Sequence, residues 1–256
     1  LFHTLQLCWP KARHLWIFCG KGNYGSDGYV LARLAKQAGY SVQVAAFDEP
    51  SPSIPAEQAR YDWLKAGGSY GSLQSLHGQP DVIIDALLGI GPSTTLRGDL
   101  LAWIQFINRQ ASPVLAVDIP SGLNADTGMP LGGAVHATTT LTLVGLKPGL
   151  LTGMAADFTG ELYFSDLKDR HSQYCDTAGV RLLDYSAVLP LLPLRARTAH
   201  KGNNGKVLLA GGGLGMPGAI RLAGEAALRA GAGLVRVFCH PDNQLLVFSG
   251  RPELML

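Results

Sequence analysis

Short apolar runs alternate along the chain with longer stretches in which apolar residues recur every three or four positions. The runs predict β-strands, and the periodic stretches between them predict α-helices. The expected strands are His14 to Cys19, Ser41 to Phe47, Asp81 to Leu87, Val114 to Asp118 and Thr138 to Val144. The expected helices are Asp27 to Ala38, Ala56 to Ala66 and Leu100 to Gln110, and Phe2, Leu5, Leu7 and Trp9 fit the tail of another.

This alternation predicts the fold class. Strands that are apolar throughout and separated by helices are typical of a parallel sheet covered on both faces. We therefore expect an α/β protein with a Rossmann-like three-layer αβα arrangement and a mostly parallel sheet. Ligands of such sheets bind at the carboxyl ends of the strands, so candidate chemistry is sought there.

The pattern changes between about Leu167 and Ala199, which predicts a domain boundary. A polar cluster, RHSQYCDT, is followed by the proline-rich VLPLLPLRAR. Beyond it we expect a βαβ unit with strands Lys206 to Ala210 and Leu234 to Cys239 around a helix that ends at Ala230. A unit of this length buries too little surface to be a stable domain. We therefore expect the second domain to be incomplete, and the absence of an initial Met suggests that the first one is too.

Composition excludes several classes. The 256 residues are 47% hydrophobic and 16% charged, and the net charge of +2 gives no reason to expect a nucleic-acid or membrane partner. No apolar stretch approaches 18 residues and the start lacks secretory features, so a cytoplasmic location is expected. The four cysteines, Cys8, Cys19, Cys175 and Cys239, are expected to be buried, reduced thiols. The oligomeric state stays open, with a homo-oligomer as one option.

The segment LWIFCGKGNYGSDGYV predicts a strand, a glycine turn and a helix. Gly20, Gly22 and Gly25 match the dinucleotide fingerprint, in which glycines let the backbone approach a phosphate at the helix N-terminus. Asp48 or Glu49 follows the second strand about where a ribose-binding acid belongs. These features alone favour an NAD(P)-dependent oxidoreductase, whereas a turn needed only for helix packing is the alternative. A second match, from Gly213 to Gly218, is weaker because Pro217 lacks an N–H group.

Carboxylates near the strand ends point to a different chemistry. Asp27, Asp85 and Asp118 are expected to converge on one crevice, although any one such Asp is also typical of a turn or cap. Asp27 would repel a pyrophosphate, so it is expected to cap the helix, to hold a ribose hydroxyl or to help bind a cation. Ser121 is either an oxygen ligand of a hard cation or a turn former, and no zinc-type spacing occurs.

Four segments carry a family resemblance. They are GKGNYGSDGYVLAR (20–33), DALLGIG (85–91), VDIPSG (117–122) and LKPGLLTG (146–153). In order and spacing they resemble the NAD(P)H-hydrate epimerase family. Three later segments, HKGNNG (200–205), GMPG (215–218) and AIRLAGEAALRAGAGLVRV (219–237), resemble the opening of ADP-dependent NAD(P)H-hydrate dehydratase domains. The chain as a whole thus resembles bifunctional NAD(P)H-hydrate repair enzymes.

The resemblance implies two domains and one repair function. Residues 1–185 would form an epimerase domain that lacks its start, and residues 186–256 would be the first part of a ribokinase-like dehydratase domain. The epimerase would interconvert the R and S forms of hydrated NADH and NADPH (NADHX and NADPHX) at C6 of the nicotinamide ring. A complete dehydratase would restore the S form with ADP or ATP. An oxidoreductase and a catalytically silent nucleotide-binding module are the alternatives.

The resemblance also implies roles for individual residues. Substrate contacts are expected from the first turn of the helix, from the loop at Gly89, from Asp118 and, in the dehydratase part, from Ala219. The full set is Asn23, Tyr24, Gly25, Ser26, Asp27, Gly89, Ile90, Gly91, Asp118 and Ala219. Asp85 and Ser121 match positions that bind a potassium ion, and Tyr24 stands at a third. Asp118 is the leading candidate for the residue that moves a proton to and from the C6 hydroxyl.

Two departures from the family pattern qualify these expectations. The family usually reads G-x-G-N-N-G-G-D-G, whereas Tyr24 and Ser26 replace the second Asn and the following Gly here. Tyr24 is expected to weaken or rebuild the cation site, and Ser26 adds a Cβ where positive φ is expected. Lys147 is expected to pair with a phosphate, with one of the acids or with solvent. Later dehydratase segments do not occur before Leu256, so dehydration by these residues alone is not expected.

Overall fold

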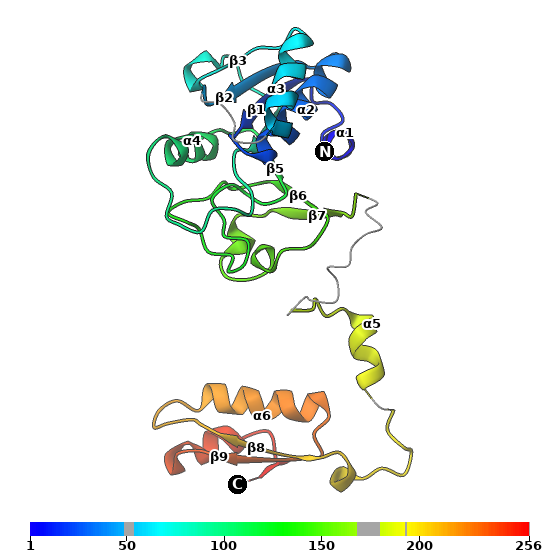
Figure 1. Cartoon of the computed structure of the whole chain (residues 1–256). Helices are drawn as coiled ribbons and strands as arrows, with labels where there is room; N and C mark the ends of the chain where they lie inside the picture. The colour runs from blue at the N-terminus through cyan, green and yellow to red at the C-terminus, as the bar shows by residue number, and fades with distance from the viewer. Residues whose placement is uncertain (49–53, 168–179, 193, 256) are drawn as a thin grey trace. The chain divides into compact units, whose positions relative to one another are not determined.

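The computed structural model describes residues 1–48, 54–167, 180–192 and 194–255, which form two units (Figure 1). The contacts divide the chain into Leu1–Val180 and Arg181–Leu256. This division does not test the assignment of residues 1–185 and 186–256 to two functional domains, which stays a prediction.

The first unit is built on a parallel sheet of seven strands in the order β3-β2-β1-β4-β5-β6-β7. The first six follow the strand order of a dinucleotide-binding fold, in which the order reverses between β1 and β4. The strands are β1 (His14–Cys19), β2 (Ser41–Ala46), β3 (Tyr70–Gly71), β4 (Val82–Ala86), β5 (Val114–Val117), β6 (Thr139–Leu143) and β7 (Glu161–Ser165).

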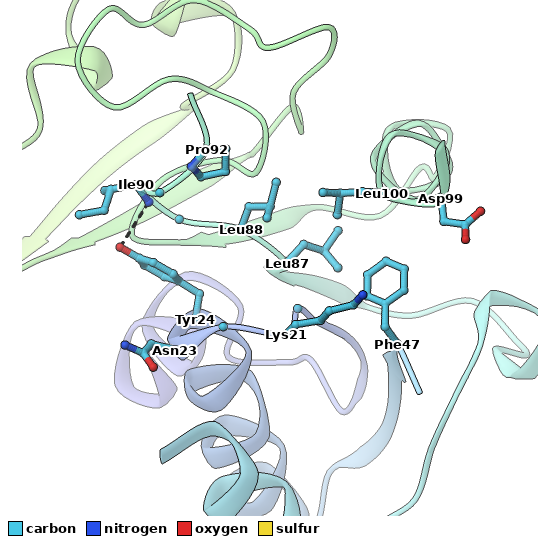
Figure 2. A pocket seen from close by; sticks show the side chains of 14 residues that line it. Lys21, Asn23, Tyr24, Phe47, Leu87, Leu88, Ile90, Pro92, Asp99 and Leu100 are labelled. Carbon is cyan, nitrogen blue, oxygen red and sulfur yellow. Dashed lines mark hydrogen bonds between the residues drawn. The ribbon is translucent and has the colours of Figure 1, made fainter. Parts of the chain in front are cut away.

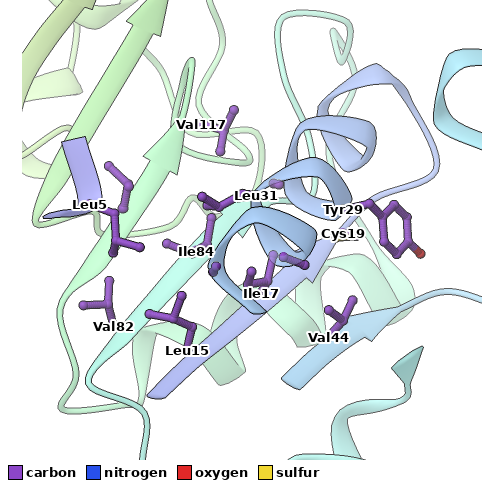
Figure 3. Close-up of a cluster of buried hydrophobic side chains, with 14 of the residues drawn as sticks. Leu5, Leu15, Ile17, Cys19, Tyr29, Leu31, Val44, Val82, Ile84 and Val117 are labelled. Atoms are coloured by element: carbon purple, nitrogen blue, oxygen red, sulfur yellow. The ribbon is translucent and has the colours of Figure 1, made fainter. Parts of the chain in front are cut away.

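Helices cover both faces of this sheet because successive strand residues point in opposite directions. One buried cluster joins Leu15, Ile17 and Ile84 to the helices α1 (Phe2–Cys8), α2 (Asn23–Gln37) and α3 (Ile54–Lys65), and Figure 3 shows it around α2. The alternate residues of the same strands, Trp16 and Phe18 among them, pack against α4 (Gly98–Asn108). The three-layer α/β prediction is therefore confirmed.

The second unit has a parallel sheet of three strands in the order β10-β9-β8. Its strands are β8 (Lys206–Ala210), β9 (Leu234–Phe238) and β10 (Leu254–Met255). Its helices are α5 (Tyr185–Val188), α6 (Gly218–Ala230) and α7 (Gln244–Phe248). The expected βαβ unit is present, and Val235, Val237 and Ile220 form a small core that β10 and α7 complete.

The differences from the expected elements are local. The helix predicted from Asp27 begins at Asn23, and the short strand β3 and the edge strand β7 were not predicted. Of the cysteines, Cys19 is buried as expected, whereas Cys8 and Cys239 are only half-buried and all three are free thiols. Cys175, Glu49 and the polar cluster RHSQYCDT lie outside the described residues. Among the residues described, no helix is long and apolar enough to cross a membrane.

Candidate active site

The turn between β1 and α2 lies against the loop that follows β4. The Gly20 amide donates to the Ala86 carbonyl at 2.9 Å, and a Cβ at Gly20 would lie 1.7 Å from the Leu87 carbonyl oxygen. A Cβ at Gly25 would lie 1.9 Å from the Gly20 carbonyl oxygen. No side chain fits at such distances, so these glycines permit close approach of backbone to backbone. The turn thereby brings the N-terminus of α2 to the carboxyl end of the sheet.

A cleft of about 580 Å³ opens at this edge of the sheet (Figure 2). Its walls come from the glycine turn, the loop after β4, the end of β2 and the start of α4. The lining residues are Gly20, Lys21, Gly22, Asn23, Tyr24, Phe47, Leu87, Leu88, Gly89, Ile90, Gly91, Pro92, Asp99 and Leu100. Backbone amides at the start of a helix and a nearby lysine suit an anionic ligand such as a diphosphate.

Tyr24 connects this cleft with a buried carboxylate. Its hydroxyl donates to Oδ2 of Asp118 at 2.8 Å and lies 3.5 Å from the Ile90 amide. Its ring occupies the space beside Gly89, where a Cβ would lie 1.7 Å from the ring. Burial, and next the hydrogen bond to Asp118, raise the pKa of Tyr24 above its usual value. Tyr24 is therefore a neutral hydrogen-bond donor at physiological pH.

Asp118 follows β5 directly and is 4% exposed. Its φ of 69° lies in the left-handed region, which Asp adopts more readily than most residues with a side chain. Oδ1 accepts from the Leu143 amide at 2.8 Å, from the Thr142 hydroxyl at 3.2 Å and from Lys147 Nζ. The ammonium and the neutral donors together compensate the desolvation of this carboxylate.

Lys147 is anchored by more than this ion pair. Its Nζ also donates to the Leu143 carbonyl at 2.8 Å and to the Thr142 hydroxyl at 3.1 Å. Only 15% of its side chain is exposed. Of the three alternatives left open by the sequence, pairing with an acid is the one that the structure shows.

Asp85 lies in β4 and is surrounded by uncharged donors. The Ser121 amide donates to Oδ2 at 2.8 Å, the Ser121 hydroxyl donates to Oδ1 at 2.6 Å, and the Leu87 amide lies 3.3 Å from Oδ1. Both side chains are fully buried. Burial raises the pKa of Asp85 to about 6, against the opposing effect of the Ser121 hydrogen bonds. A bound cation would offset the desolvation of this carboxylate.

The structure corrects two expectations for the start of α2. Asp27 does not cap the helix, because Gly22 is the N-cap and the helix begins four residues before Asp27. Burial, and next the charge of Asp118, raise the pKa of Asp27, so these two acids lie close enough to interact. Ser26 is helical and does not have positive φ; its hydroxyl donates to the Asn23 carbonyl. The added Cβ of Ser26 therefore causes no backbone strain.

The expected site residues fall into three groups. Asn23, Tyr24, Gly89, Ile90 and Gly91 line the cleft. Gly25, Ser26, Asp27 and Asp118 are not among the residues that line the cleft, although Asp118 accepts a hydrogen bond from Tyr24, which does line it. Ala219 lies in α6 of the second unit.

Other residues of the cleft were missed by the sequence reasoning. Lys21, Phe47, Asp99 and Leu100 line it, and Thr142 supports the Asp118 pair. Lys21 lies inside the glycine motif and Phe47 ends a predicted strand, so their positions could have indicated the cleft. Asp99 and Leu100 belong to no motif, and no sequence pattern predicts that the start of α4 lies near the β1–α2 turn.

The predicted potassium ligands are only partly brought together. Oxygen atoms of Asp85, Ser121 and the Leu88 carbonyl lie within one hydrogen-bonded cluster, which suits a hard cation. The hydroxyl of Tyr24 is instead engaged with Asp118. Within the described ranges, no three His, Cys, Asp or Glu side chains gather as a metal site.

Comparison with known proteins decides the family. The model described as "YjeF-related protein N-terminus" matches residues 1–149, more than half of the chain. The chain belongs to this family. A second model, described as "NAD(P)H-hydrate dehydratase", matches residues 207–256. The family resemblance expected from the sequence is thus confirmed in both parts of this YjeF-family chain.

Relatives of the chain carry names of two kinds. A bifunctional NAD(P)H-hydrate repair enzyme of Escherichia coli is 42% identical over 258 residues, which cover 100% of this chain and 50% of the relative. The chain spans about half the length of this relative and of a similar one from Coxiella burnetii. An NAD(P)H-hydrate epimerase of Legionella pneumophila is 33% identical over 192 residues, which cover 70% of this chain and 71% of that protein.

A solved structure shares the fold. The crystal structure of the yeast protein ynu0 matches with a TM-score of 0.52 and 20% sequence identity, and the match covers 58% of this chain and 68% of the yeast chain. At this identity the likeness supports the fold.

Proposed function

We propose that this YjeF-family chain is an NAD(P)H-hydrate epimerase, which interconverts the R and S forms of hydrated NADH and NADPH. The observation that carries the proposal is the buried Asp118, held by Lys147 and reached from the cleft through the Tyr24 hydroxyl. The names of the relatives from Escherichia coli and Legionella pneumophila support the substrate and the reaction.

The cleft would bind the dinucleotide through its diphosphate. The amides at the start of α2 and the side chain of Lys21 lie on one wall, and both attract negative charge. The loop 87–92 forms the opposite wall with mostly apolar residues, which suit a nicotinamide ring. In this arrangement the hydrated ring lies next to Tyr24.

Asp118 would act through Tyr24. When the C6–O bond breaks, the phenol gives its proton to the departing hydroxyl, and the phenolate takes back a proton that the Lys147 ammonium supplies through Asp118. The lone pair of the ring nitrogen forms a C6–N double bond as water departs. When water adds to the other face of C6, the proton returns along the same path. No proton is consumed, and the product differs from the substrate only at C6.

The finer assignments of the site belong to the same proposal. We place a potassium ion, where one binds, at Asp85, Ser121 and the Leu88 carbonyl; it would fix the loop after β4. We assign residues 186–256 to a domain that uses ADP or ATP to dehydrate the S form in its complete form. NADHX and NADPHX as the partners, and the cytoplasm as the location, stay predictions.

A coupled assay tests the epimerase. A mixture of R and S hydrates of NADH is treated with a separate, complete dehydratase and ADP until the S form is consumed. The chain is then added, with and without potassium, and the return of NADH absorbance is followed. We expect recovery well above the spontaneous rate. A folded chain that gives only the spontaneous rate contradicts the proposal, and nucleotide binding without turnover would then favour a silent binding module.

A further inference from the structure

A second cavity, of about 660 Å³, adjoins the cleft on the side of β2 and β3. Phe47 and Asp99 belong to the walls of both, so the two hollows are neighbours at the same edge of the sheet. The residues that line the second cavity are Ala46, Phe47, Asp48, Tyr70, Gly71, Ser72, Leu73, Gln74, Asp99, Ala102 and Trp103. A dinucleotide has two halves, and the first cleft offers a place for one of them.

The shared wall suits a planar base next to a diphosphate. The rings of Phe47 and Trp103 stack with centroids 4.1 Å apart and planes inclined by 17°. Lys21 Nζ lies 5.5 Å from the centroid of the Phe47 ring, on the side of the first cleft, as Figure 2 shows. A ligand whose phosphates lie near Lys21 would place its base in the second cavity, next to the stacked Phe47–Trp103 pair, of which Trp103 is 7% exposed.

The charged residues that the structure describes in this second wall are both acidic. Asp48 follows β2, and the Tyr70 hydroxyl donates to its Oδ1 at 3.3 Å. Asp99 lies in the first turn of α4. Arg60 lies near, 3.4 Å from the Tyr70 hydroxyl, but it pairs with Glu57 at 2.8 Å and does not line the cavity.

We propose that this cavity holds the adenosine half of the substrate and that Asp48 selects against a 2′-phosphate. The inference rests on the proposed epimerase function and names its preferred substrate. A carboxylate after the second strand accepts hydrogen bonds from ribose hydroxyls and repels a phosphate at the 2′ position. The chain therefore acts on NADHX in preference to NADPHX, with Asp48 as the specificity-determining residue.

Binding of two probes tests this without requiring turnover. ADP-ribose and its 2′-phosphate are titrated into the full chain by calorimetry. We expect the wild type to bind ADP-ribose about tenfold more tightly than the 2′-phosphate, and Asp48→Asn to reduce this ratio to about threefold or less. The change should come from tighter binding of the phosphorylated probe. Asp157→Asn removes the same charge from an exposed position in the first unit and should leave the ratio unchanged.

The ratio of kcat/KM for NADHX and NADPHX in the coupled assay should shift in the same way. Equal binding of both probes to the wild type, or a ratio that Asp48→Asn leaves unchanged, overturns the inference even if the chain epimerises both hydrates. A chain that shows the expected binding ratio but no epimerisation contradicts the proposed function and supports the adenosine site. The two failures are thus distinguishable.

Discussion

Two buried carboxylates at the ends of neighbouring parallel strands, Asp118 after β5 and Asp85 in β4, have different surroundings. Asp118 has an ammonium group, two hydroxyls and an amide as donors. Asp85 has donors from Ser121 and the Leu87 amide, all of them uncharged. The first carboxylate carries its own counter-charge, whereas the second is poised to share a proton or to receive a cation.

Under the proposed function, the two acids have separate tasks. Tyr24 joins Asp118 to the cleft, so a proton can pass between the carboxylate and a ligand. Asp85 instead ties the segment at Ser121 to the loop after β4, since Ser121 also accepts from the Leu88 amide at 2.8 Å. Under the proposed function, the Asp118 region carries the chemistry and the Asp85 region holds the cleft wall in place.

Removing the counter-charge of Asp118 should have the largest effect on stability. Lys147→Met keeps much of the side-chain volume but leaves a buried carboxylate without its ammonium partner. We expect the free energy of unfolding to fall by about 3 kcal/mol, because an uncompensated buried charge is costly. Urea unfolding followed by circular dichroism measures this. Lys65→Met, at an exposed position on α3, is the matched control, and an equal loss in both variants would contradict the account.

Breaking the link between Asp118 and the cleft should affect turnover more than folding. Tyr24→Phe keeps the ring beside Gly89 and removes only the hydroxyl. We expect epimerisation to slow about a hundredfold, which is typical of losing a group that transfers a proton, with nucleotide binding nearly unchanged. Tyr61→Phe, on the exposed side of α3, should have the wild-type rate. A wild-type rate for Tyr24→Phe would mean that Asp118 meets the substrate without the phenol.

Asp85 should make the free energy of unfolding depend on pH. Its folded-state pKa of about 6 lies above its ordinary value of 3.8. Between these two pH values the folded protein therefore binds more protons than the unfolded protein, and the free energy of unfolding falls as pH rises through about 6. In buffer without potassium, this loss should amount to about 1 kcal/mol between pH 5 and 7. Asp85→Asn should lack it, so the gap between the two unfolding free energies should change with pH. Parallel pH profiles for the two proteins would contradict the pKa assignment.

Much of the fold could be predicted because buried strands leave a strong apolar signal. β1 and β8 have the expected bounds, and the remaining predicted strands differ only at their ends. The edge strand β7 was missed because its half-exposed residues form no apolar run. The start of α2 was missed because glycines disfavour helices in isolation, yet Gly25 and Gly28 are helical here. Close packing explains why a glycine stands in this helix, because a Cβ at Gly28 would lie 2.6 Å from Cys19 Sγ.

The candidate site could be predicted as a set of residues but not as a set of contacts. The strand-end positions of Asp85 and Asp118 indicated one edge of the sheet. The pairing of Tyr24 with Asp118 joins residues 94 positions apart, and no local pattern encodes it. The split between an Asp118 cluster and an Asp85 cluster also depends on which donors the fold supplies. Sequence motifs therefore indicated the residues of the candidate site, and packing decided which of them are in contact.

The epimerisation rate of the Asp118→Asn variant tests the central claim most directly. Asn tolerates the positive φ of this position and keeps an oxygen that can accept from Lys147 Nζ, and a circular dichroism spectrum checks that the variant is folded. Purified R hydrate of NADH is mixed with the wild-type or the variant protein, and the amount of S form is measured over time after chromatographic separation. The account predicts a rate at least about a thousandfold lower for the variant. A rate within a few-fold of the wild type would contradict it.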